Sequence, residues 1–195
     1  MGSGAGALRF KKISQFYAMG LMSALRRVVH RSYFKLRGMK IGSGAAVHIS
    51  TDVHHPSRVA IGENSTIYKH ASIYPTAKGS FRMGKRSHTA PYAYFLIADN
   101  HLTLGDDVAI GPFCVFVCHS NAARSKGAIF SQNYEDGDIR IGNNVFIGAH
   151  CTFLPGTVIE DHVVVAAQSV VKGRLESHAI YGGAPARLLK RLDRE

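Results

Sequence analysis

Hydrophobic positions recur every six residues along most of this chain. From position 141 the sequence divides into the units IGNNVF, IGAHCT, FLPGTV, IEDHVV and VAAQSV, each of which begins with a β-branched residue or phenylalanine and has a small residue fifth. A period of six fits neither an amphipathic helix, with about 3.6 residues per turn, nor one continuous strand, with a period of two. It predicts very short strands joined by corners, each with one apolar side chain pointing inward.

The same six-residue spacing continues upstream of residue 141, and its inward positions come in groups of three. Three short strands per turn predict a prism with three flat faces, built from 18-residue coils that begin near 41, 61, 83, 104, 141 and 159. Coils stacked about 4.8 Å apart bond to one another through their backbones, and the end coils need caps. We therefore predict an all-β parallel β-helix of about six coils over residues 39–178. The inward positions are Ile41, Val47, Val53, Ile61, Ile67, Ile73, Met83, Thr89, Phe95, Leu104, Ile110, Phe116, Ile141, Ile147, Phe153, Ile159, Val165 and Val171.

One interval between coils is much longer than the others. The fourth and fifth coils start 37 residues apart, 19 more than one coil needs. We therefore predict an inserted loop over residues 119–140. Loops of this length in compact folds usually serve a function.

The formal net charge of +11 is unevenly distributed. Residues 1–51 hold nine basic and no acidic side chains, whereas the rest of the chain carries 15 basic and 13 acidic ones. Apolar residues at three- and four-residue spacing predict a basic amphipathic helical segment over 8–38, of the kind that lies on an anionic membrane. The alternative is a cap on the first coil, and the two roles are compatible. Residues 1–7 are expected to be disordered or a remnant of an expression vector.

Composition also bears on compartment and partners. Three cysteines cannot form a full disulfide framework, and the opening residues do not resemble a cleavable secretory signal. The longest uncharged stretch of the basic segment has 13 residues, whereas a spanning helix needs about 20. We expect a cytoplasmic protein, with peripheral contact at the inner face of the membrane. Nucleic-acid binding is not expected, because no recognised module accompanies the charge.

The run IGNNVFIGAHCTFLPGTVIEDHVVVAAQSVV, followed by YGGAPARLLKR, resembles the last coils of the hexapeptide-repeat acyltransferases. The similarity is to the branch with galactoside, maltose and polysaccharide O-acetyltransferases, and it covers about residues 39–191. It implies a left-handed β-helix, a homotrimer and acetyl-CoA bound in the cleft between adjacent prisms. We expect residues 179–195 to form a terminal segment with a short helix that caps the last coil.

Eleven histidines raise the question of a metal, since the γ-class carbonic anhydrases, which share the fold that the resemblance implies, bind zinc through three converging histidines. His54 and His55 fall in an early corner, while His150 and His162 stand two units apart and point from different corners, so no metal is expected. His119 stands where the insertion begins, and its placement is similar to that of the family's catalytic histidine. Imidazole titrates near neutrality and suits a general base. Its orienting partner is left open among Asp99, Asn100, Glu135, Asp136 and Asp138.

The resemblance also implies a coenzyme site. Small residues at Ala149 and Ala167 would let the pantetheine arm lie along the backbone, and Lys172, Arg187 and Lys190 would meet phosphates. Cys118, beside His119, is not expected to act as a nucleophile, because a thiol gains little by attacking a thioester.

The resemblance to this family implies an acetyl-CoA-dependent O-acetyltransferase. Its acceptor would be a sugar hydroxyl of a cell-envelope glycan or its precursor, with His119 as general base in direct transfer. Some relatives place an Asn in the acceptor pocket, but the unit TAPYAY puts Tyr92 or Tyr94 there. One alternative is N-acetylation of a nucleotide-linked amino sugar. Another is a catalytically silent, membrane-associated trimeric scaffold.

Overall fold

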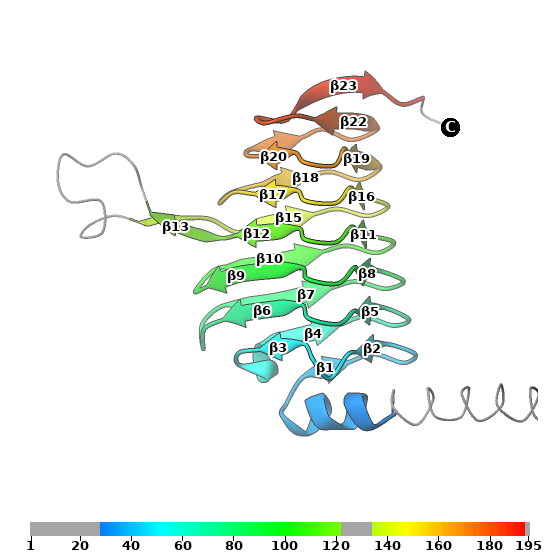
Figure 1. Cartoon of the computed structure of the whole chain (residues 1–195), viewed down its shortest axis with the longest axis vertical. Coiled ribbons are helices and arrows are strands. Elements are labelled where there is room, and N and C mark those ends of the chain that lie inside the picture. Colours follow the sequence, from blue (N-terminus) through cyan, green and yellow to red (C-terminus); the bar gives the residue numbers. More distant parts are fainter. Residues whose placement is uncertain (1–27, 122–133, 194–195) are drawn as a thin grey trace, which may run out of the picture.

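The computed structural model describes residues 28–121 and 134–193, which form a prism of short strands stacked in coils (Figure 1). Three parallel sheets make its faces, and each coil adds one strand to each sheet. Sheet A contains β1 (Lys40–Ile41), β4 (Val59–Ile61), β7 (Ser80–Met83), β10 (His101–Leu104), β15 (Ile139–Ile141), β18 (Val158–Ile159) and β21 (Arg174–Leu175). Sheet B contains β2 (Ala46–Val47), β5 (Thr66–Ile67), β8 (His88–Thr89), β11 (Ala109–Ile110), β16 (Phe146–Ile147), β19 (Val163–Val165), β22 (Ala179–Gly182) and β23 (Arg187–Arg191). Sheet C contains β3 (Asp52–Val53), β6 (Ser72–Pro75), β9 (Tyr94–Ala98), β12 (Val115–Val117), β17 (Thr152–Phe153) and β20 (Val170–Val171).

This order confirms the predicted coils. Every predicted inward side chain, from Ile41 to Val171, is at most 7% exposed. Where the core is widest, the rings of Phe95, Phe116 and Phe153 stack with centroids 4.8 and 4.5 Å apart. The fifth positions are buried too, and serines there donate to backbone carbonyls, as Ser87 Oγ does to Gly105 O at 2.9 Å. Six-residue spacing therefore fixes both the inward side chains and the small residues beside them.

The corners between sheets have a recurring backbone conformation. The fourth residue of many units has a positive φ, as in Asn144 (51°), His150 (59°) and His162 (59°). Such a residue points away from the core, which confirms the interpretation of His150 and His162 as corner residues. Corner side chains also stack along the prism: the rings of Tyr92 and Phe113 lie 5.0 Å apart and those of Phe113 and His150 4.9 Å apart.

The basic segment is described only from residue 28. Residues 28–36 are helical and lie beneath the first coil (Figure 1), where Phe34 is fully buried. The cap interpretation is therefore confirmed for this part. Residues 1–27, which include the start of the predicted helix, lie outside the described residues. No helix in the described part is long and apolar enough to cross a membrane.

The predicted carboxy-terminal helix is wrong. Arg187–Arg191 form β23, which turns back and pairs antiparallel with β22. A helix would leave the backbone groups at the upper edge of β22 without partners, whereas a returning strand bonds to them. The last coil is thus capped by a β-hairpin.

The insertion also differs from a plain loop. Its base is a two-stranded antiparallel ribbon of β13 (His119–Asn121) and β14 (Tyr134–Asp136), which projects from the prism (Figure 1). The chain rejoins sheet A at Ile139, so the insertion ends at residue 138, two residues before its predicted end at 140. Residues 122–133 lie outside the described residues.

Candidate functional site

The ribbon places the candidate base at the edge between sheets C and A. After β12, the backbone N–H of Cys118 donates to Leu96 O at 2.8 Å, and the next residue begins β13. The ribbon register pairs His119 with Asp136, Ser120 with Glu135 and Asn121 with Tyr134. Side chains alternate between the two faces of a strand, so the side chains of His119, Asp136 and Tyr134 share one face of the ribbon.

His119 and Asp136 form a hydrogen-bonded pair. Nδ1 of His119 lies 2.8 Å from Oδ1 of Asp136, and the His119 side chain is 30% exposed. With its proton on Nδ1, the ring donates to the carboxylate and keeps the Nε2 lone pair. Nε2 has no hydrogen-bond partner among the residues that the structure describes. The arrangement is that of a base held by a carboxylate, with the basic nitrogen left for a substrate.

Asn100 steadies this carboxylate from the prism. Its Nδ2 donates to Asp136 Oδ1 at 3.0 Å and to Cys118 O at 3.0 Å. The hydrogen bonds from His119 and then Asn100 lower the pKa of Asp136 below its usual value. A lowered carboxyl pKa stabilises the fold above the group's unfolded pKa, and this contribution is lost as the pH falls through the folded value. Asp136 is therefore ionised throughout the neutral range.

The other candidate partners of His119 are engaged elsewhere. Asp99 accepts a hydrogen bond from Thr76 and lies 3.6 Å from Lys78 Nζ. Asp138 accepts the backbone N–H of His101 at 2.8 Å and pairs with Arg140. Glu135 binds Lys172, with Oε1 and Nζ 2.6 Å apart. The question left open by the sequence is thus answered by Asp136, with Asn100 one step behind it.

The neighbouring thiol is not activated. Cys118 is fully buried, and this burial raises its pKa to about 12. Because the thiolate is the nucleophilic form, the burial of Cys118 disfavours its nucleophilic form at neutral pH.

Sequence reasoning missed one member of the site. The Tyr134 ring lies 4.3 Å from the His119 ring, centroid to centroid, and Tyr134 is 59% exposed. Tyr134 and Asp136 are two residues apart on one strand, which is a signal for a shared face, but it is usable only once the ribbon is recognised.

The return of the ribbon to the prism requires a glycine. A Cβ on Gly137 would lie 2.4 Å from Gly156 N and 2.9 Å from its Cα. Backbone atoms cannot give way at that distance, so residue 137 has no room for a side chain. This close passage sets where Asp136 emerges.

The coenzyme candidates lie on a different edge. Ala149 and Ala167 each follow a sheet B strand, at the edge between sheets B and C. Successive coils touch there backbone to backbone, since a Cβ on Gly148 would lie 2.5 Å from Ala167 N. Arg187 pairs with Gly182 in β22, and a Cβ on Gly182 would lie 3.0 Å from Ala166 Cβ. The structure therefore brings Ala149, Ala167 and Arg187 to one edge.

The other two coenzyme-binding candidates, Lys190 and Lys172, do not lie at the edge of Ala149, Ala167 and Arg187. Lys190 is exposed further along β23, opposite Ile180. Lys172 follows β20 at the edge between sheets C and A, where His119 emerges two coils below.

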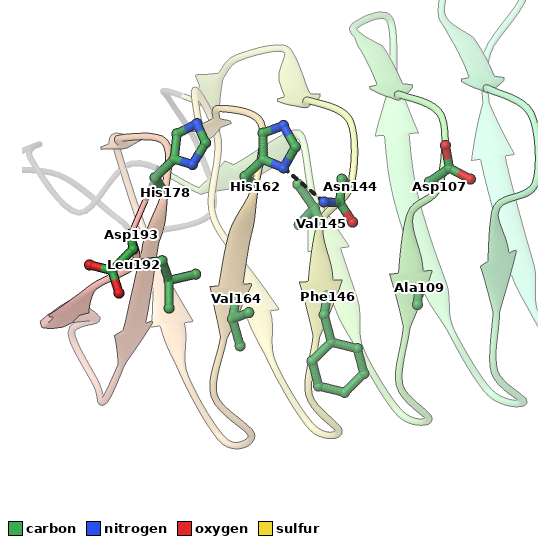
Figure 2. A pocket seen from close by; sticks show the side chains of 10 residues that line it. All are labelled: Asp107, Ala109, Asn144, Val145, Phe146, His162, Val164, His178, Leu192 and Asp193. Atoms are coloured by element: carbon green, nitrogen blue, oxygen red, sulfur yellow. Dashed lines mark hydrogen bonds between the residues drawn. The ribbon is translucent and has the colours of Figure 1, made fainter. Parts of the chain in front are cut away.

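A groove on sheet B involves none of these residues. It has a volume of about 530 Å³ and an apolar floor that includes Phe146 and Val164, and His162 and His178 stand at its rim (Figure 2). In residues 28–121 and 134–193, no three His, Cys, Asp or Glu side chains converge as metal ligands.

Comparisons with known proteins identify the six-residue repeat in this chain. A family model described as bacterial transferase hexapeptide (six repeats) matches residues 138–173. Galactoside O-acetyltransferase of Escherichia coli (strain K12) is 27% identical over 137 residues, which cover 68% of this chain and 64% of that protein. The probable macrolide acetyltransferase of Lysinibacillus sphaericus is 31% identical over 121 residues, 50% of this chain and 67% of that protein. The chain thus spans just under two thirds of the galactoside enzyme.

Solved structures share the fold. A variant of AntD, an N-acyltransferase from Bacillus cereus in complex with dTDP-4-amino-4,6-dideoxyglucose and coenzyme A, superposes with a TM-score of 0.75 at 24% identity. The superposition covers 84% of this chain and 89% of that one. It supports the predicted parallel β-helix and is consistent with the left-handed sense.

Proposed function

The chain belongs to the bacterial hexapeptide-repeat transferase family, and from that premise we propose that it is an acetyl-CoA-dependent O-acetyltransferase. Its acceptor is a sugar hydroxyl of a cell-envelope glycan or its precursor. The observation that carries the proposal is the 2.8 Å pair of His119 and Asp136, which leaves Nε2 of the ring available. A hydroxyl needs such a base, because it is a weak nucleophile until its proton is removed.

Transfer proceeds in two proton movements. Nε2 of His119 takes the proton of the acceptor hydroxyl as its oxygen attacks the thioester carbonyl carbon. When the tetrahedral intermediate collapses, the C–S bond breaks and the imidazolium returns the proton to the departing thiolate. Asp136 stays ionised and stabilises the imidazolium. The products are the acetyl ester and free CoA, with no covalent enzyme intermediate.

Acetyl-CoA supplies the activated acetyl group. The edge at Ala149 and Ala167 gives the pantetheine arm a path along small side chains. Arg187, at the top of that edge, and Lys190 supply positive charge for the phosphates. The AntD variant was solved with coenzyme A, which supports a coenzyme site on this fold.

Nitrogen transfer is the second candidate, favoured by the overlap with an N-acyltransferase. The galactoside O-acetyltransferase favours oxygen. A panel of sugars and amino sugars separates the two, and a silent scaffold would cleave the thioester with neither.

Removing the base should abolish most turnover. We expect His119→Ala to lower kcat about 10²- to 10⁴-fold, the usual contribution of a general base, in an assay of free thiol release. His178→Ala, which removes another half-buried imidazole far from the ribbon, serves as the control and should keep wild-type turnover. Equal turnover in both variants would refute the proposed base.

Replacing Arg187 should weaken the binding of acetyl-CoA and leave the transfer step unchanged. A charge-assisted hydrogen bond to phosphate contributes about 1.5 kcal/mol or more, so we expect Arg187→Ala to raise KM for acetyl-CoA about tenfold with kcat little changed. Arg82→Ala, on the exposed face of sheet A, is the matched control. With 3′-dephospho acetyl-CoA the difference should shrink if Arg187 meets the 3′-phosphate. A KM that does not respond to Arg187 would remove this residue from the coenzyme site.

We propose a homotrimer because the two halves of the site lie on different edges. A pantetheine arm that runs along the edge of Ala149 and Ala167 meets His119 of a neighbouring chain more readily than His119 of the chain to which it is bound. Sheet C offers a packing surface, since the outward residues of its strands above the first coil are uncharged. They are Ser72, Tyr74, Tyr94, Leu96, Val115, Val117, Thr152 and Val170, all partly exposed in the single chain. Sheet A instead points Lys40, Arg82, Arg140 and Arg174 outward.

A shared site predicts complementation. His119→Ala and Arg187→Ala chains, dissociated and reassembled together, should release more thiol at low acetyl-CoA than the mean of the two separate proteins. Sedimentation should report three chains per particle. Additive activity, or a monomeric particle, would contradict the shared site.

The membrane contact remains a proposal for the basic segment. Each Lys or Arg near an anionic surface contributes about 1 kcal/mol, so replacing Lys11, Lys12, Arg26 and Arg27 by Gln should release the full chain from anionic vesicles in a co-sedimentation assay. Replacing Arg82 and Arg140 by Gln is the control. Unchanged pelleting of the first variant would exclude the segment as a membrane anchor. A chain held in this way would act at the inner face of the membrane.

A further inference from the structure

The two faces of the catalytic ribbon make contact with different coils. Because the side chains of Asp136 and Glu135 are neighbours on one strand, they leave opposite faces of β14. Asp136 is bound by Asn100, which follows β9 in the third coil. Glu135 is bound by Lys172, which follows β20 in the sixth coil. The ribbon thus has a side-chain contact toward each end of the prism.

The upper contact crosses two coils. In sheet C, β17 separates β12, from which the ribbon leaves, from β20, which precedes Lys172. Two strand spacings amount to about 10 Å, a distance that the long side chains of Glu135 and Lys172 bridge together. Their charged atoms approach to 2.6 Å, with 43% and 51% of the side chains exposed.

We propose that Lys172 is a positioning residue that, through Glu135, sets the orientation of the ribbon carrying His119 and Asp136. The inference rests on the proposed function, in which His119 is the base. It assigns Lys172 a part in the transfer step, in place of the coenzyme contact implied by the family resemblance.

The physical reason lies in the weakness of an isolated ribbon. Two strands alone are marginally stable in water, so the attachments of this ribbon to the prism decide where His119 lies. The hydrogen bond between His119 and Asp136 joins the two strands of the ribbon, so it is kept when the whole ribbon tilts relative to the prism. What a tilt changes is the position of Nε2 relative to a thioester bound along the edge of the neighbouring prism. A displacement of about 1 Å can cost about 10²-fold in rate.

The test separates positioning from coenzyme binding by kinetics. Lys172→Met keeps the length of the side chain and removes its charge, and Glu135→Gln removes the partner's charge. For both we expect kcat to fall about 3- to 10-fold, a part of the loss that full misplacement causes, with KM for acetyl-CoA within about twofold of wild type. The charge-reversed pair of Lys172→Glu with Glu135→Lys should recover most of the lost kcat. Arg174→Met, which breaks an ion pair with Glu160 outside the ribbon, is the matched control.

Hydrogen exchange provides a readout that does not depend on activity. Amides of β13 and β14 should exchange faster in Lys172→Met and Glu135→Gln than in wild type or Arg174→Met. A higher KM for acetyl-CoA with unchanged kcat would overturn the proposal in favour of a phosphate contact, and unchanged ribbon exchange would also overturn it. Failure of the proposed function is seen separately, as full turnover in His119→Ala, and leaves the exchange result valid.

Discussion

The stacking of each coil directly on the next, backbone to backbone, is the constraint on which the rest of this molecule depends. In sheet B the N–H of Thr66 donates to Ser87 O, that of His88 to Val108 O and that of Ala109 to Val145 O, each at 2.8–2.9 Å. One strand spacing therefore separates every coil from its neighbours. The core has room for one large side chain per face and a small one beside it. No coil can lengthen except by sending the excess out of a corner.

This constraint decides where chemistry is possible. The interior is filled by side chains such as Phe95, Phe116 and Phe153 and has no space for a substrate. Functional groups must lie on the faces, at the corners or on segments extruded from them. The fourth coil extrudes a ribbon at His119, and Gly137 lets it return against Gly156. A fold made of repeats gains a particular site by departing from the repeat at one place.

The same reasoning explains how far the sequence could predict the structure. Inward positions are tied to a fixed period, so all of them were correctly predicted, even Thr89, which is polar and fully buried. The beginning of the insertion was predictable as a break in that period. The partner of His119 was not, because Asp136 is 17 residues away and reaches the ring only through an antiparallel register. The terminal helix was predicted wrongly because RLLKR favours a helix locally, whereas the open edge of β22 offers backbone partners to a strand.

In the proposed mechanism, the placement of base and carboxylate on one ribbon separates two requirements of catalysis. The proton chemistry needs a fixed distance between His119 and Asp136, and the ribbon register provides it internally. Transfer also needs a fixed distance between His119 and the thioester, which depends on how the ribbon is attached to the prism. Asn100 contributes to both, since one amide group bonds to Asp136 and to the backbone of Cys118. Glu135 takes no part in the hydrogen bond between His119 and Asp136. Its contact with Lys172 therefore affects only the distance between His119 and the thioester. In the proposed mechanism, the attachments to the prism therefore set the reach of the ribbon, while the ribbon register keeps His119 beside Asp136.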